Sequence, residues 1–254
     1  MNLNLLKVKQ PGGNYPTLLK PGKTDIVNAK AHTPPAQHLA DSAAHIRRIS
    51  SASTAHGLTE IYEPDVNLAV WRRVLPDSLR QYIAWLSEQQ AKLYPIQRVM
   101  ALSEIEESLS LWLPDHRLTK TLITDICLLA DMYGCLFDMD AVGLRLTPLT
   151  TAMCPRFHTD RVACRLLTTY GGPGTEWLPE EHLDRERLGM GNKGLGDARS
   201  GLFTNADAIQ RLTEGDVALL KGTAWNGNEQ HGLVHRSPAL AAGEFRLLLS
   251  LDFA

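Results

Sequence analysis

Apolar residues recur at helical spacing in two stretches of the first half of the chain. In the first, Pro76-Asp77 is a helix start signal with Asp77 as the candidate N-cap, and one apolar stripe runs from Leu79 to Leu93. The second stretch, from Asp115 to about Tyr133, carries a similar stripe, and Gly134 is a suitable stop. Both stripes predict packing faces rather than cofactor-binding surfaces.

Beyond Gly134 the period of the apolar pattern changes from 3.6 to 2, which is typical of strands. After an earlier strand at 67–71, this pattern predicts strands at 142–146, 162–170, 175–178, 217–221, 232–235 and 244–253. The stretch 180–205 is rich in glycine and predicts a loop, of a length often found in lids and binding loops.

The last predicted strand has two different faces. Phe245, Leu247, Leu249, Leu251 and Phe253 share one face, which needs cover from the preceding helices, while Arg246, Leu248, Ser250 and Asp252 share the other. A cation and a hydroxyl on the second face suit the inside of a barrel that holds a polar ligand. Helices first and many short strands afterwards predict an α+β fold, in which packing helices precede a double-stranded β-helix, a jelly-roll or cupin-like barrel.

The distribution of Pro, Gly and Ser predicts where the folded part begins. Residues 1–56 are expected to be a flexible N-terminal tail that buries too little apolar surface to offset its ordering entropy. Residues 57–254 are expected to form a single domain, with structure starting near Leu58. Within it, 57–136 is predicted to be mainly helical and 137–254 to be the double-stranded β-helix.

Composition narrows the class of protein. Lys plus Arg is 26 and Asp plus Glu is 28, so the net charge is −2 and nothing predicts binding to nucleic acid or to a membrane surface. No apolar run approaches the about 20 residues needed to cross a bilayer, and the start is not a secretory signal. A cytoplasmic protein is the default. The four cysteines lack CxxC spacing and are expected to be unpaired thiols, mostly buried.

The candidate chemistry begins with His158-Thr159-Asp160. On an extended segment, residues two apart project to the same side, so His158 and Asp160 are candidate metal ligands. His235 is the candidate third ligand, with His231 as the alternative, and two His with one carboxylate leave metal positions open. A hydrogen-bonded structural pair is the other reading of His158 and Asp160. A second HxD, His182-Leu183-Asp184, lies in a charged stretch without a strand pattern and predicts a solvated loop or short helix.

A basic residue after the distant His is the candidate anchor for a carboxylate. A hairpin between Val234 and Phe245 would bring Arg246 alongside His235, and a guanidinium binds a carboxylate bidentately. Ser250 shares its face and could add a hydroxyl. Arg165 is the alternative anchor, and a salt-bridged barrel residue is the alternative role for Arg246.

Aromatic residues near these positions have a plainer interpretation. Tyr170 is a further candidate for cofactor binding, but Tyr170, Trp177 and Trp225 are each more simply packing residues. Asp216 is expected to cap a turn.

The C-terminal part resembles the iron(II)- and 2-oxoglutarate-dependent oxygenases. The resemblance is carried over about 110 residues by His158-Thr159-Asp160, the run 166–172, Gly215-Asp216-Val217, His235-Arg236 and Arg246. It implies a double-stranded β-helix with His158, Asp160 and His235 as iron ligands and Arg246 as the 2-oxoglutarate anchor. The family's Arg-x-Ser signature would place Ser at 248, where this chain has Leu248.

A closer resemblance, over roughly residues 57–254, is to the bacterial domain of unknown function 1826 family. It is carried by the runs 157–160, 167–170, 172–177 and 235–238. That resemblance supplies no established reaction, and it implies a link to zinc homeostasis through gene neighbourhood.

Two functions follow as expectations. The first is an oxygenase that uses iron(II) and 2-oxoglutarate to hydroxylate a small molecule or a protein side chain, with the Gly-rich loop 189–201 closing over the site. The second is a non-redox zinc-binding barrel protein, because the same three ligands suit zinc.

Overall fold

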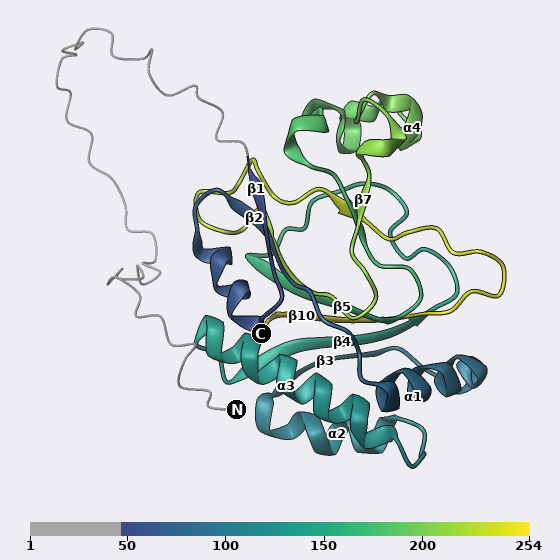
Figure 1. Ribbon diagram of the computed structural model, residues 1–254. Helices are drawn as coiled ribbons and strands as arrows, with labels where there is room; N and C mark the ends of the chain where they lie inside the picture. Colours follow the sequence, from purple (N-terminus) through teal and green to yellow (C-terminus); the bar gives the residue numbers. More distant parts are fainter. Residues whose placement is uncertain (1–46) are drawn as a thin grey trace, which may run out of the picture. The chain divides into compact units, whose positions relative to one another are not determined.

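The computed structural model describes residues 47–254, which combine a large sheet with a few helices (Figure 1). The α-helices are α1 (Asp77–Glu88), α2 (Ile105–Trp112), α3 (Thr119–Phe137) and the short α4 (Asp197–Ser200). The strands are β1 (Arg48–Ala52), β2 (Val66–Trp71), β3 (Ile96–Ala101), β4 (Ala141–Leu149), β5 (Cys164–Gly171), β6 (Glu176–Trp177), β7 (Gln210–Arg211), β8 (Val217–Lys221), β9 (His235–Arg236) and β10 (Arg246–Phe253).

Two sheets organise these strands. The seven-stranded sheet has the order β1-β2-β8-β5-β10-β4-β3, and the three-stranded sheet has the order β7-β6-β9. Only β1 and β2 pair in parallel; every other pairing between these strands is antiparallel. Residues far apart in sequence therefore meet side by side, as in the central β5–β10 pair, where Leu167 lies opposite Ser250.

An apolar core lies between the two sheets. Its buried members come from both sheets and from the loops beside them: Leu68, Val70, Leu167, Trp177, Leu212, Ala218, Leu220, Leu233 and Leu248. Leu248 belongs to this core while Leu247, Leu249 and Leu251 are buried on the opposite face of β10, so the two predicted faces of this strand are confirmed. The face that carries Arg246 and Ser250 is therefore the inner one.

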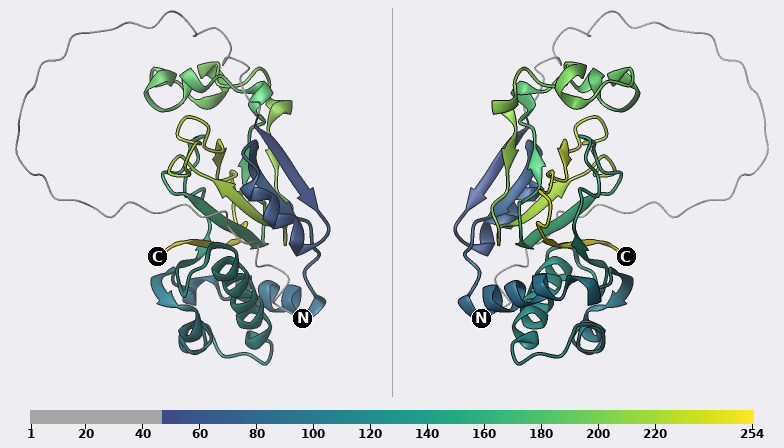
Figure 2. Two further views of the ribbon diagram at one scale, coloured as in Figure 1. Left: turned by 90° about the vertical axis from the view of Figure 1, so that its left-hand side faces the viewer. Right: turned by 90° about the vertical axis from the view of Figure 1, so that its right-hand side faces the viewer.

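The three long helices cover the outer face of the large sheet, where α3 contacts β4 and α1 contacts β5 (Figures 1 and 2). The predicted helix at Pro76-Asp77 is confirmed, but Pro76 is its N-cap and Asp77 its first residue. The carboxylate of Asp77 accepts from Arg80 instead of capping the backbone. The helix also ends at Glu88, short of the predicted end at Leu93.

The second predicted helix is confirmed as α3, but Gly134 does not stop it. The helix continues to Phe137 and ends where Asp138 adopts a left-handed conformation, with φ of 55°. Gly134 has a packing role: a Cβ there would lie 2.6 Å from Leu102 Cδ1 and 2.7 Å from the Met139 carbonyl oxygen. A glycine inside a helix can therefore mark close packing and not an end.

The strand predictions hold best where the sequence runs are long and apolar. The predicted strands 142–146, 162–170, 217–221 and 244–253 correspond to β4, β5, β8 and β10. Within 57–136, the strand predicted at 67–71 is confirmed as β2, whereas β3 was not predicted, and both strands join the large sheet. The helix α2 was not predicted either, because its eight residues carry too short a pattern.

The N-terminal boundary needs correction. The predicted tail, residues 1–56, lies mostly outside the described residues, but its last part does not: β1 spans Arg48–Ala52 and pairs with β2. Its five residues, rich in Ser and Ala, lack the apolar alternation that marks a strand. Ordered structure thus extends at least ten residues before Leu58. Among the described helices, none is long and apolar enough to span a membrane.

Candidate metal centre

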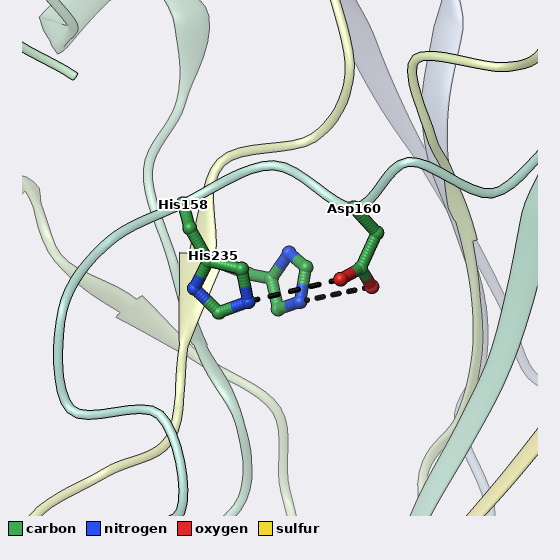
Figure 3. A group of neighbouring side chains, drawn as sticks. All are labelled: His158, Asp160 and His235. Atoms are coloured by element: carbon green, nitrogen blue, oxygen red, sulfur yellow. Dashed lines mark ion pairs between the residues drawn. The ribbon is translucent and has the colours of Figure 1, made fainter. Parts of the chain in front are cut away.

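His158 and His235 are brought together by a backbone bridge. His158 lies in the connection between β4 and β5, and His235 opens β9. The amide of each residue donates to the carbonyl of the other, at 3.0 Å in both directions. Their rings lie 4.7 Å apart between centroids, which places both imidazoles on the same side of the bridge (Figure 3).

Asp160 completes the group from the same connection. Its Oδ1 lies 3.7 Å from His158 Nε2 and its Oδ2 lies 3.4 Å from His235 Nε2 (Figure 3). The ligand atoms of all three residues fall within 4.8 Å of one another, and no other such group of His, Cys, Asp or Glu exists within residues 47–254. The backbone of Asp160 is held by Thr223, whose amide and hydroxyl both donate to its carbonyl.

The hydrogen bonds of the two imidazoles engage Nδ1 and leave Nε2 available to bind a metal. Nδ1 of His158 lies 2.9 Å from the Arg156 carbonyl, and Nδ1 of His235 lies 3.1 Å from the Leu233 carbonyl. A carbonyl only accepts, so each Nδ1 carries the proton and each Nε2 keeps a free lone pair. Both Nε2 atoms face Asp160. These residues therefore fit a divalent metal ion without rearranging their tautomers.

Electrostatics favours the ligand forms at neutral pH. Burial lowers the pKa of His158, and the neighbouring His235 lowers it further, so His158 is neutral. Burial opposes ionisation of Asp160, but its neighbours His235 and Arg165 prevail and lower its pKa to about 2. Metal binding would need little proton release from these two groups.

Arg165, the alternative carboxylate anchor, is occupied by two carboxylates. Its Nη1 donates to Asp160 Oδ2 at 2.6 Å, while Nε and Nη2 donate to the two oxygens of Asp252 at 2.6 and 3.0 Å. Arg165 thus holds one oxygen of Asp160 and leaves Oδ1 for a metal. As placed here, the guanidinium supports the candidate ligand.

Arg246 sits on the inner face at the start of β10 and is 1% exposed. Its neighbours are hydroxyls: Nη2 donates to Thr175 at 2.8 Å and to Thr169 at 3.3 Å, and Nη1 donates to Ser237 at 3.4 Å. Its Nε is buried without a partner, and no carboxylate of the described chain forms an ion pair with it. Burial lowers the pKa of Arg246 to about 10, which leaves it charged at neutral pH.

The route by which Arg246 reaches this place differs from the prediction. The predicted hairpin is wrong, because β9 pairs with β6 in the small sheet while β10 pairs with β4 and β5 in the large one. The chain crosses between the sheets from Ser237 to Phe245, and Ser237 Oγ still ends beside Arg246. Leu248, at the position of the missing serine, packs in the apolar core.

The other predicted cofactor-binding residues, Ser250 and Tyr170, lie on opposite faces of the large sheet. Ser250 is buried on the inner face of β10, two positions beyond Leu248. Tyr170 is not on that face: it is the extra residue of a bulge between β5 and β10, and its hydroxyl donates to Asp125 of α3 at 2.7 Å. This contact turns Tyr170 toward the helices, so the structure supports a packing role for it.

The remaining sequence candidates lie apart from the group. His231 is not part of it; its carbonyl accepts from Asn67. The second HxD lies in short turns as predicted, with Asp184 accepting from the amide of Glu186 and from Arg187. The thiols of all four cysteines are unpaired, but only Cys164 is buried, so the expectation of mostly buried thiols is wrong.

The sequence did not reveal the residues that contact Arg165 and Arg246. Asp252, which pairs with Arg165, and the hydroxyls of Thr169, Thr175 and Ser237 around Arg246 come from separate strands and loops. Their only signal was indirect, since the threonines and the serine lie within or beside the runs 167–170, 172–177 and 235–238.

The chain matches one sequence family and is similar to several solved structures. A sequence model of the family described as "Protein of unknown function (DUF1826)" matches residues 52–252. No curated protein matches the chain. Among solved structures, the dioxygenase for auxin oxidation from rice is 11% identical, with a TM-score of 0.48, over 82% of each chain.

Two further solved structures are also similar. Dioxygenase for auxin oxidation 1 from Arabidopsis thaliana, in a complex with 2-oxoglutarate, is 9% identical with a TM-score of 0.48, over 82% of this chain and 92% of that one. A prolyl-4-hydroxylase from Pseudomonas putida is 12% identical with a TM-score of 0.37, over 74% of this chain and 86% of that one.

Proposed function

This chain belongs to the DUF1826 family, and we propose that it is an iron(II)- and 2-oxoglutarate-dependent oxygenase acting on a small molecule or a protein side chain. In this proposal the two facing sheets form the double-stranded β-helix expected from the sequence. The metal lies at the bridge between His158 and His235, and the co-substrate extends from it toward Arg246.

The candidate ligands support iron. Two imidazoles and one carboxylate occupy three metal positions and leave the others open, a donor set typical of non-haem iron(II) oxygenases. The Nδ1 bonds to the carbonyls of Arg156 and Leu233 fix both rings in the binding tautomer. Arg165 restrains Asp160, so that its free oxygen faces the imidazoles.

The single observation that supports binding of the co-substrate is the unpaired charge of Arg246. Burying a cation without a counter-charge is costly, and buried charges in proteins are normally paired. Arg246 is 1% exposed and has hydroxyl partners only, with Nε left over. A carboxylate of a bound ligand would supply the missing counter-charge through a bidentate, charge-assisted contact.

The residues of this chain then have separate tasks. His158, Asp160 and His235 would hold the metal, and Arg246 with the hydroxyl of Thr175 would bind the distal carboxylate of 2-oxoglutarate. The core around Leu248 excludes water from the contact. When bound, iron(II) and 2-oxoglutarate supply the activation of dioxygen that oxidises a substrate.

Binding of 2-oxoglutarate to the metal-loaded protein tests this proposal. Calorimetry under anaerobic conditions with iron(II) should show stoichiometric binding to the wild type. Arg246→Gln removes a charged hydrogen-bond partner worth roughly 1.5–3 kcal/mol, and should weaken binding about ten- to over a hundredfold. Iron content should stay unchanged, because Arg246 is no ligand.

Arg187→Gln is the matched control. Arg187 is partly exposed, lies on a different segment from Arg246, and pairs with the nearby Asp184 at 3.3 Å. It should bind 2-oxoglutarate like the wild type. A wild type that binds iron or zinc but no 2-oxoglutarate would contradict the oxygenase proposal, and would support the non-redox zinc protein instead.

A further inference from the structure

A segment of the chain that has no role in the proposed reaction packs against the residues that precede the two candidate histidines. Residues 178–209, here called the cover segment, join β6 to β7 through short turns and α4 and lie apart from the helices α1–α3 (Figure 1). It has an apolar cluster of its own, which comprises Leu178, Leu202 and Ala208, with Leu183, Leu188, Phe203 and Ile209 packed against them.

That cluster is completed by two residues from outside the cover segment. Phe157 and Val234 are both buried in it, at 4% and 1% exposure. Phe157 immediately precedes His158 and Val234 immediately precedes His235. The ring of Phe157 also packs edge-on against Phe203, at 5.9 Å between centroids. The cover segment thus packs on both backbones of the bridge that carries the two imidazoles.

A single carboxylate adds polar contacts to the same two segments of the chain. Asp197, the first residue of α4, is 8% exposed and accepts three hydrogen bonds. Its Oδ1 accepts from Arg156 Nε at 2.8 Å, and its Oδ2 accepts from the amide of Phe157 at 3.0 Å and from Arg236 Nη1 at 3.2 Å. Arg156 and Phe157 precede His158, and Arg236 follows His235.

These contacts also extend beyond Asp197. Arg156 Nη2 donates to the Leu195 carbonyl, and the guanidinium of Arg236 lies 4.2 Å over the ring of Phe157. Arg236 Nε donates to Glu176 Oε2 at 2.7 Å. The carbonyl of Arg156 is the acceptor that sets the tautomer of His158. Asp197 therefore acts on the backbone unit that presents His158 Nε2.

We propose that Asp197 is a positioning residue for the metal centre, and that metal binding is coupled to the folding of the cover segment over it. The coupling is reciprocal: if the folded cover segment favours the metal-binding geometry of His158 and His235, bound metal must stabilise the folded cover segment equally. This inference rests on the proposed metal site but not on the use of 2-oxoglutarate.

Cobalt(II) alone is the probe, because its visible spectrum reports both occupancy and ligand geometry. Asp197→Asn keeps the shape of the side chain and removes its charge. Outer partners of metal ligands typically contribute 10–100-fold in metal affinity, so cobalt binding should weaken by about that factor. The visible spectrum at saturating cobalt should also change, which general destabilisation of the fold would not cause.

Asp207→Asn is the matched control, because Asp207 lies in the same segment, is exposed and contacts neither histidine-bearing strand. It should retain both the affinity and the spectrum of the wild type. Equal cobalt affinity and identical spectra for Asp197→Asn and the wild type would overturn the proposal.

Limited trypsin digestion gives a second readout on the intact wild type. Arg185, Arg187, Lys193 and Arg199 are cleavage sites within the cover segment. Cobalt should slow cleavage there several-fold in the wild type and in Asp207→Asn, and much less in Asp197→Asn. Cleavage that is indifferent to cobalt in a wild type shown to bind it would contradict the coupling. A wild type that shows the coupling but binds no 2-oxoglutarate would contradict only the proposed reaction.

Discussion

The tautomer of two imidazoles determines what the candidate centre can bind. Each Nδ1 is committed to a carbonyl two residues before its own histidine, so each Nε2 is left as a donor atom for a metal. The spacing of His158 and Asp160 in the sequence was sufficient to find the pair. It did not show how the rings are oriented, because that depends on local backbone turns.

Removing a ligand should remove the metal. His158→Ala, Asp160→Ala and His235→Ala should each abolish stoichiometric iron(II) or zinc binding, measured by metal analysis after dialysis, because two remaining ligands hold a divalent ion poorly. The unfolding midpoint of metal-free His158→Ala should stay close to that of the metal-free wild type, because His158 is partly exposed.

His231→Ala is the control for these variants and should keep its metal, since His231 lies outside the group. Loss of metal in His231→Ala with retention in His235→Ala would move the third ligand to residue 231.

A buried lysine offers a pH-dependent test at the residue scale. Lys221 is 1% exposed, donates to the Glu63 carbonyl at 2.9 Å and lies 4.8 Å from the ring of Trp225. Burial lowers the pKa of Lys221 to about 8 from its ordinary value of 10.5. The folded state then binds fewer protons than the unfolded state between these pH values, so stability rises with pH across that window.

Lys221→Met should therefore be stabilised at pH 7, where the cost of burying the charge is fully present, by about 1–3 kcal/mol. The difference in the free energy of unfolding between Lys221→Met and the wild type should shrink from pH 8 to pH 10.5, measured by urea denaturation. A difference that stays constant over this range would show that Lys221 titrates normally.

At the scale of elements, strand register accounts for the residues that the sequence did not reveal. The alternation of β10 was visible in the sequence, and it correctly separated Arg246 and Ser250 from the outer apolar face. The partners Asp252–Arg165 and Arg246–Thr169 were not visible, because they depend on how β5 and β10 align and on the bulge at Tyr170. The predicted hairpin failed for a related reason: nothing local indicates that a chain changes sheets.

Gly134 gives a test of packing between elements. Alanine is the better helix former by about 1 kcal/mol, so an exposed position would be stabilised by Gly134→Ala. Here the added methyl group would meet Leu102 and the Met139 carbonyl at less than 3 Å. We expect a net loss of about 1–3 kcal/mol in the free energy of unfolding, by chemical denaturation.

Gly196→Ala is the control for that substitution, because no atom lies within 4 Å of a Cβ at this position and its φ is −68°. It should change the free energy of unfolding by less than Gly134→Ala does, since the only expected cost is the weaker preference of alanine for the N-cap position. A stabilising Gly134→Ala would mean that Leu102 can move aside.

At the scale of the whole molecule, the described residues form layers: helices, a large sheet, an apolar interior and a small sheet. The sequence predicted α1, α3, the main strands and the inward-facing cation, since each depends on local periodicity. It did not predict β1 or β3, which form the two edges of the large sheet, because short edge strands are specified by their partners more than by their own pattern.

The corrected N-terminal boundary can be tested by truncation. Removing residues 1–56 deletes β1 and its pairing with β2, together with the ion pair between Arg48 and Asp65 at 2.7 Å. We expect this truncation to lower the thermal unfolding midpoint by several degrees compared with removal of residues 1–46, which keeps β1. Equal midpoints for the two truncations would show that β1 contributes nothing to stability.

The central claim is that iron and 2-oxoglutarate meet at His158, Asp160 and His235. The most direct measurement is the visible absorption spectrum of the iron(II) protein under anaerobic conditions, recorded as 2-oxoglutarate is added. Under the oxygenase proposal, a charge-transfer band should saturate at one equivalent in the wild type and be absent in Asp160→Ala. A wild type that holds iron(II) at this site and develops no band at any 2-oxoglutarate concentration would contradict it.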